Sequence, residues 1–110
     1  MTEAFYEPGK VPGRLVRDIY STVKNIPRRL TLGSVARSSR QTNVAVQLIK
    51  LDHPVLLLWG MEDKITPPEV ALHFHDLLQN SEIVFIEECG HVPMLEKPEF
   101  FNRLVSSFLE

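Results

Sequence analysis

Two short apolar runs, each followed by a helical pattern, dominate the second half of the chain. The first run is "PVLLLW" at residues 54–59 and the second is "IVFI" at residues 83–86. Neither run shows the alternation of apolar and polar residues that is typical of a half-exposed strand, so both predict strands covered on two faces, as in a parallel sheet. The order strand, helix, strand, helix over residues 51–110 predicts a right-handed parallel unit and therefore an α/β fold.

The helices of this half have clear start signals. Thr66 to Glu69 reads T-x-x-E with a proline at the first helical position, which predicts a capping box. The apolar positions of that helix are Val70, Ala71, Phe74, Leu77 and Leu78. Pro98 opens the final helix. Its apolar side comprises Phe100, Phe101, Leu104, Val105, Phe108 and Leu109.

The first half is less regular and predicts a helical segment over residues 1–50. Residues 1–12 contain two prolines and a glycine, which indicates an irregular lead-in. Apolar residues recur at helical spacing from Gly13 until Pro27, which predicts an amphipathic helix. A weaker helical stretch covers about residues 30–49. Its polar part, "ARSSRQTN" at 36–43, predicts a loop between two short helices.

Composition and charge narrow the functional classes. The chain of 110 residues has the length of one small domain, and its net charge of -2 conceals an asymmetry. Residues 1–50 carry nine Lys and Arg against three acids, and residues 51–110 carry three against eleven. The basic residues are spread out without interleaved aromatic residues, so we expect a solvated helical surface and no nucleic-acid partner. No apolar run approaches the roughly 18 residues of a membrane-spanning helix, and the start lacks a signal-peptide pattern, so we expect a cytoplasmic protein without a membrane partner.

Two polar residues follow the predicted strands at similar distances. Asp63 and His91 lie four or five residues beyond their strands, in loops that contain Gly60 and Gly90. Functional groups gather beyond the carboxyl ends of parallel strands, where neighbouring loops converge. An aspartate beside an imidazole fixes its tautomer and stabilises the imidazolium that forms when the ring accepts a proton. The spacing therefore predicts an acid and base pair.

The same region resembles the C-terminal part of the α/β-hydrolases. The patterns W-G-x-x-D-x-x-x-P and G-H-x-P-x-x-E-x-P occur in that order, within a resemblance that covers about residues 48–110. The resemblance implies that Asp63 is the catalytic acid and His91 the general base. It also implies a small-molecule, ester-like substrate, no cofactor, and a lid formed by residues 1–50. Trp59 and Val92 are candidates for the substrate pocket, although Trp59 also fits a place in the core.

The nucleophile of that family has no counterpart in these residues. The elbow motif G-x-S-x-G, or a variant with Asp or Cys at its centre, is absent from the sequence. We therefore expect a truncated hydrolase without measurable catalysis of its own. A serine nucleophile would indicate ester, thioester or carbon-carbon bond cleavage, and an aspartate would indicate epoxides or haloalkanes. The alternative is an inactive remnant or interaction module that forms a homo-oligomer or binds a partner chain through an exposed sheet edge.

The remaining polar residues suggest no further site. Cys89 is the single cysteine of the chain, which rules out an internal disulfide. It is expected to pack as a small apolar group. His73 and His75 are two positions apart on a helix and do not face one another, so we expect no metal site there. Glu62, Glu87 and Glu88 are interpreted as solvated charges. Glu96 is expected to pair locally and to shape the loop that carries His91.

Overall fold

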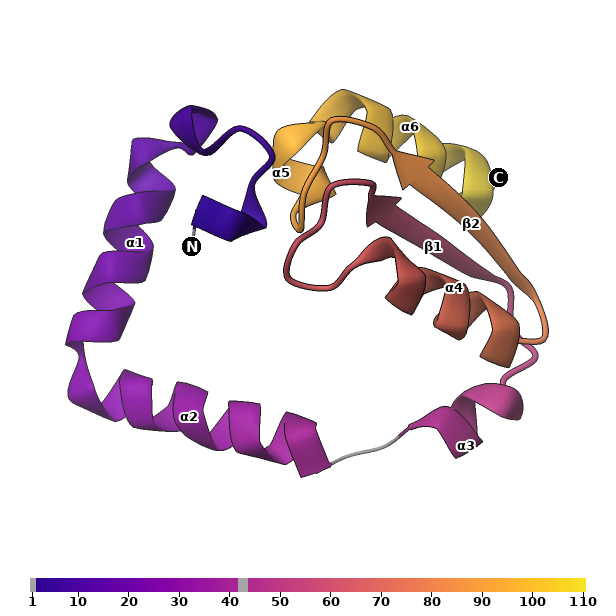
Figure 1. Cartoon of the computed structure of the whole chain (residues 1–110), viewed down its shortest axis with the longest axis horizontal. Helices are drawn as coiled ribbons and strands as arrows, with labels where there is room; N and C mark the ends of the chain where they lie inside the picture. Colours follow the sequence, from indigo (N-terminus) through magenta and orange to yellow (C-terminus); the bar gives the residue numbers. More distant parts are fainter. Residues whose placement is uncertain (1, 42–43) are drawn as a thin grey trace. The chain divides into compact units, whose positions relative to one another are not determined.

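The computed structural model describes residues 2–41 and 44–110, which fall into two compact units (Figure 1). The α/β unit comprises the N-terminal residues through Gly9 together with Ala45–Glu110, and the helical unit comprises Lys10–Val44. The sequence-based division into residues 1–50 and 51–110 stays a prediction. No helix in the described part of the chain has both the length and the apolar character to cross a bilayer.

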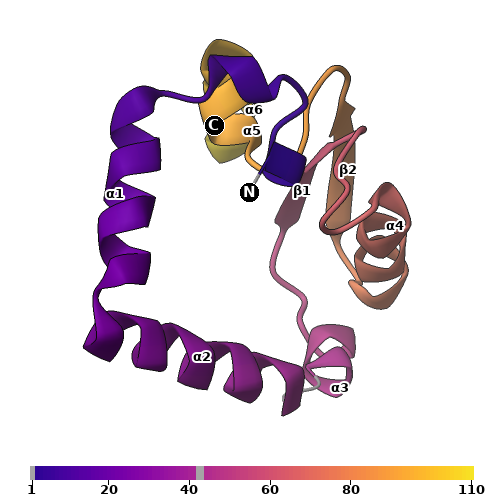
Figure 2. The same ribbon diagram turned by 60° about the vertical axis from the view of Figure 1, so that its left-hand side comes forward.

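The α/β unit is built on two parallel strands. Strands β1 (Val55–Gly60) and β2 (Ser81–Ile86) pair in register from Val55 opposite Ser81 to Gly60 opposite Ile86. Figures 1 and 2 show helix α4 (Pro68–Leu77) on one face of this sheet and helices α5 (Pro93–Glu96) and α6 (Pro98–Leu109) on the other. The helices are α3 (Ala45–Ile49), α4 (Pro68–Leu77), α5 (Pro93–Glu96) and α6 (Pro98–Leu109), with 3-10 turns at Thr2–Ala4 and Pro8–Lys10. The predicted α/β fold with a parallel sheet flanked by helices is confirmed.

The core is small and lies between α4, β2 and the loop that follows β2. Its buried apolar residues are Ala71, Leu78, Ile86 and Cys89. The predicted apolar face of α4 is confirmed, because Val70, Phe74 and Leu77 are half-buried. The strands are less covered than their uniform apolar sequence predicts: β1 is half-buried up to Trp59, since each strand has a neighbour on one side only among the described residues. In α6, Leu109 is 76% exposed, so the predicted apolar side is only partly covered.

The predicted capping box at the start of α4 is wrong. The N-cap position is Pro67, and no side chain caps the helix. Thr66 precedes the cap, and its hydroxyl bonds instead to the Asp63 carboxylate, 2.9 Å away. A capping threonine accepts a helix N–H on its hydroxyl oxygen, whereas the Thr66 oxygen lies 3.2 Å from His91 Nδ1 and the residue stands one position before the helix cap.

The helical unit consists of α1 (Gly13–Lys24) and α2 (Ile26–Gln41). Asn25 separates them in an extended conformation, and its side chain accepts a hydrogen bond of 3.0 Å from the Arg28 N–H, as a helix cap does. The predicted loop over residues 36–43 is wrong for 36–41, which belong to α2, while residues 42 and 43 lie outside the described residues. Ala, Arg and Gln are good helix formers, so a polar segment without Gly or Pro does not interrupt a helix.

Candidate active site

The loops that follow β1 and β2 approach one another backbone to backbone. Met61 N–H donates to Ile86 O at 2.9 Å, and Glu62 N–H donates to Cys89 O at 3.0 Å. A Cβ atom on Gly60 would collide with the Gly90 carbonyl oxygen and lie 2.5 Å from that of Cys89. The missing side chain of Gly60 is therefore what lets the two loops converge beyond the strand ends.

A hydrogen bond between Glu62 and Cys89 also joins these two loops. The Glu62 carboxylate accepts the Cys89 N–H at 2.9 Å, so its interpretation as a solvated charge is wrong. The carboxylate satisfies a backbone donor that would otherwise be unpaired at the strand end. Cys89 is fully buried, which confirms the prediction that it packs as a small apolar group. Burial, together with the nearby Glu96 charge, raises the pKa of the Cys89 thiol to about 11.

Asp63 is the buried acid of the site, with only 6% of its surface exposed. Its Oδ1 accepts the N–H groups of Ile65 at 2.9 Å and Thr66 at 3.0 Å. Its Oδ2 accepts the Thr66 hydroxyl at 2.9 Å and lies 3.0 Å from His91 Nδ1. Burial alone raises the pKa of this carboxyl, but the hydrogen bonds from Thr66, His91 and Ile65 lower it below its ordinary value of 3.8. Asp63 is therefore ionised at neutral pH.

His91 faces this carboxylate, and its side chain is 38% exposed. Its Nδ1 lies 3.0 Å from Asp63 Oδ2 and 3.2 Å from Thr66 Oγ1. The single hydroxyl proton of Thr66 is donated to Asp63, which leaves the hydroxyl oxygen as an acceptor. Both oxygens around Nδ1 then accept, so the arrangement favours the tautomer with the proton on Nδ1 and a lone pair on Nε2.

Thr66 is the member of this cluster that the sequence patterns did not reveal. Asp63 and Thr66 are three positions apart, and an Asx-type turn that places Asp63 Oδ1 on the following N–H groups was the available signal. The competing T-x-x-E pattern assigned Thr66 to the helix start. The structure brings together Asp63 and His91, the two residues proposed for the site, and adds Thr66 between them.

The two pocket candidates lie beside this cluster. The Trp59 indole N–H donates to Thr66 O at 2.8 Å, and its ring centroid lies 6.2 Å from that of Phe74. Trp59 thus supports the loop that carries Thr66. Val92 is half-buried, and its carbonyl accepts the N–H groups of Leu95 and Glu96 at the start of α5. A role for Trp59 or Val92 in a substrate pocket stays a prediction.

Two other sequence predictions can be compared with the structure. The Glu96 carboxylate accepts the Gly90 N–H at 2.7 Å, which confirms that Glu96 pairs locally, while its effect on the loop of His91 stays a prediction. His75 Nδ1 lies 2.7 Å from the Ser81 hydroxyl, and His73 is exposed. Over residues 2–41 and 44–110, no group of three or more His, Cys, Asp or Glu side chains is placed to hold a metal ion.

Comparison with known proteins identifies similar chains. The profile of a family described as alpha/beta hydrolase fold matches residues 12–98. A pimeloyl-[acyl-carrier protein] methyl ester esterase from Neisseria meningitidis serogroup B / serotype 15 (strain H44/76) is 41% identical over 63 residues, which are 57% of this chain and 24% of the esterase. A 2-hydroxy-6-oxononadienedioate/2-hydroxy-6-oxononatrienedioate hydrolase from a Pseudomonas species is 27% identical over 106 residues, which are 94% of this chain and 38% of that hydrolase.

A solved structure extends the match to three dimensions. An alpha/beta hydrolase enzyme from the metagenome of lagoon sediments of Mar Chica, Morocco, superposes with a TM-score of 0.77 and 35% identity. The superposition covers 87% of this chain and 44% of that enzyme. The chain spans 20–25% of the length of the curated methyl ester esterases that it matches.

Proposed function

Because the chain belongs to the alpha/beta hydrolase family, we propose that Asp63 and His91 are the acid and the general base of a hydrolase that cleaves an ester or a related bond. The observation that carries this proposal is the contact of 3.0 Å between Asp63 Oδ2 and His91 Nδ1. A buried carboxylate on one ring nitrogen and a partly exposed ring are what a general base needs.

The proposed mechanism follows from the hydrogen bonds of the pair. Asp63, ionised, accepts the Nδ1 proton of His91 and leaves the Nε2 lone pair available. A nucleophile gives its proton to Nε2 as it attacks the substrate carbonyl, and His91 then gives that proton to the leaving group. Asp63 stabilises the intervening imidazolium. The nucleophile is not encoded in these 110 residues, so the proposed reaction requires a nucleophile supplied from outside them.

Ester hydrolysis is the first chemistry to test. The similarity to a methyl ester esterase and to a dienedioate hydrolase supports bond hydrolysis and favours an ester as the starting substrate class. The identity of the nucleophile decides between the alternatives, because a serine suits esters, thioesters and carbon-carbon bonds, whereas an aspartate suits epoxides and haloalkanes.

The tautomer of His91 tests the acid and base pair on the 110-residue chain itself. Long-range proton-nitrogen NMR spectra at neutral pH should show a protonated Nδ1 and an unprotonated Nε2. Asp63→Asn should shift the ring to the other tautomer, because the carboxamide can present a donor to Nδ1. Asp52→Asn is a matched control, since Asp52 lies 3.5 Å from the exposed His53 and away from the site. A protonated Nε2 in the wild-type ring would contradict the proposed role of His91.

Turnover tests the function in a polypeptide in which a segment with a nucleophile elbow precedes these residues. On a panel of nitrophenyl esters, His91→Ala should lower turnover by roughly a millionfold, whereas His53→Ala should leave it unchanged. Equal turnover in wild type and His91→Ala would remove His91 from the mechanism and favour a non-catalytic role.

A second candidate function is docking to another chain, favoured by the edges of the two-stranded sheet. Among the described residues each strand is bonded on one side, and alternate backbone groups of a parallel strand point to the opposite edge. We propose that a second strand-bearing chain, such as another copy, pairs with such an edge. Sedimentation at low micromolar concentration should show a discrete complex. A free monomer would contradict this candidate.

A further inference from the structure

The backbone of His91 is held from outside its own loop. The N-terminal segment, residues 3–6, lies against the histidine loop, residues 89–92 (Figure 2). The His91 N–H donates to Ala4 O at 2.7 Å. The Glu96 carboxylate accepts the Gly90 N–H on Oε1 at 2.7 Å and the Tyr6 N–H on Oε2 at 2.8 Å. One carboxylate thus joins two segments that are far apart in the sequence.

Gly90 provides the surface on which these segments meet. A Cβ atom at this position would lie 2.7 Å from Ala4 O and 3.0 Å from Tyr6 N, closer than real side chains pack. It would also lie 3.1 Å from Glu96 Oε1. The absence of a side chain at Gly90 therefore permits the N-terminal segment and the Glu96 carboxylate to reach the same stretch of backbone.

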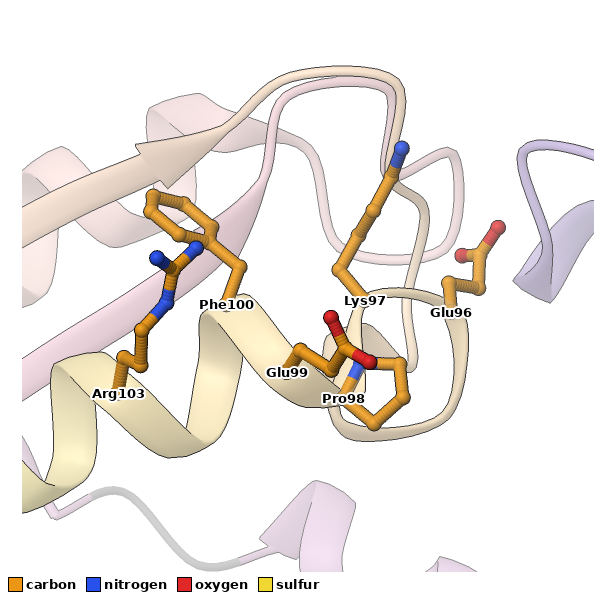
Figure 3. Close-up of a pocket in the computed structure, with 6 residues that line it drawn as sticks. All are labelled: Glu96, Lys97, Pro98, Glu99, Phe100 and Arg103. Carbon is orange, nitrogen blue, oxygen red and sulfur yellow. The ribbon is translucent and has the colours of Figure 1, made fainter.

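The short helix α5 places Glu96 for this contact. Its Glu96 N–H donates to Val92 O at 3.0 Å, and this turn directs the carboxylate back to Gly90, six residues earlier. Figure 3 shows the Glu96 carboxylate pointing away from Phe100 and Arg103, which line the same surface hollow of about 370 Å³. The neighbouring Lys97 pairs with Glu88 at 3.9 Å. The Glu96 oxygens are thus directed to two backbone donors.

We propose that Glu96 is a positioning residue for His91. Its two hydrogen bonds, to the Gly90 and Tyr6 N–H groups, form a clasp that links the histidine loop to the N-terminal segment and keeps His91 Nδ1 within hydrogen-bond reach of Asp63. This proposal rests on the proposed function of the Asp63 and His91 pair. Hydrogen bonds to a charged acceptor are about twice as strong as neutral ones, so a bridging carboxylate suits a loop that must hold one ring orientation.

Glu96→Gln tests the clasp with little change in shape. The amide group of glutamine can accept one of the two N–H groups but presents a donor to the other. Hydrogen exchange of the Tyr6, Gly90 and His91 amides should become roughly 10- to 100-fold faster. The Lys97 amide, which donates to Pro93 O at 2.9 Å, should be unaffected and serves as the internal reference. Glu99→Gln is the matched control, because Glu99 is exposed in the first turn of α6.

The His91 Nδ1–H signal separates positioning from simple stabilisation. In Glu96→Gln this NMR signal should shift or broaden, whereas in Glu99→Gln it should match the wild type. Gly90→Ala, which displaces the N-terminal segment, should speed exchange of the Tyr6 and His91 amides in the same way. A His91 Nδ1–H signal that is unchanged in both Glu96→Gln and Gly90→Ala would overturn the positioning proposal alone. A wild-type ring without a proton on Nδ1 would overturn the acid and base pair, and the positioning proposal with it.

Discussion

Replacing Thr66 by valine removes one proton donor from the centre of the site and keeps the shape of the side chain. The hydroxyl donates to Asp63 Oδ2 at 2.9 Å and lies 3.2 Å from His91 Nδ1. The Thr66 backbone makes two further hydrogen bonds: its N–H donates to Asp63 Oδ1, and its carbonyl accepts the Trp59 indole N–H. Neither bond involves the Thr66 side chain. Thr66→Val therefore isolates the hydroxyl.

The magnitude follows from the charge of the acceptor. A hydrogen bond to a charged group contributes about 1.5–3 kcal/mol, so the free energy of unfolding should fall by that amount. The lost bond is one of those that lower the pKa of Asp63, so this pKa should rise. Since one pKa unit corresponds to about 1.4 kcal/mol, the rise should be at most about 1–2 units.

Two measurements check this prediction. Carbon-13 NMR follows the Asp63 carboxyl between pH 6 and pH 2, and urea unfolding gives the change in stability. Thr66→Ser keeps the hydroxyl and should retain most of the wild-type pKa. If Thr66→Val titrates at the same midpoint as the wild type, the hydroxyl does not stabilise the Asp63 carboxylate and the reasoning is wrong.

Three further predictions concern the same loops. Because the pKa of native Asp63 lies below 3.8, its contribution to stability is present above about pH 4 and is lost as pH falls through the native pKa; melting temperatures should drop there less steeply in Asp63→Asn than in the wild type. Because burial raises the pKa of Cys89 to about 11, the free energy of unfolding should decline as pH rises from 9.0 towards 11. A thiol reagent at pH 8 should also label Cys89 far more slowly in the native chain than in the urea-unfolded chain. Gly60→Ala should abolish cooperative unfolding because its Cβ would strike the Cys89 and Gly90 carbonyls, whereas Gly33→Ala, with open space around its Cβ, should raise stability by up to about 1 kcal/mol in the same urea assay.

The pairing of Asp63 with His91 was predictable because it follows from topology. Apolar runs without alternation predict parallel strands, and parallel strands with a helical crossover end at the same edge of the sheet. Two polar residues at similar distances beyond those ends are then brought together whatever the intervening sequence. The contact of 3.0 Å between their side chains agrees with that reasoning.

The errors arose where a local pattern competes with a partner that is remote or not visible in sequence. Thr66 fits a capping box, yet its hydroxyl bonds to the Asp63 carboxylate. Glu62 resembles a solvated charge in the sequence, but in the structure its carboxylate accepts the N–H of Cys89, which lies 27 positions away in the chain. Residues 36–41 look like a loop because they are polar, although helix propensity depends on side-chain entropy and backbone competition rather than on polarity.

The contacts that orient the Asp63 and His91 pair all lie within the α/β unit. They are the Asx-type bonds to Asp63, the Thr66 hydroxyl, the glycine contact between the loops and the clasp of Glu96. Hydrogen bonds are directional, so these contacts favour the arrangement of the loops in which the His91 ring faces Asp63. The contacts that hold the Asp63 carboxylate against His91 are therefore supplied by residues 3–6 and 60–96. The proposed acid and base pair fits several bond types, and in the proposed function the nucleophile and the substrate pocket decide between them.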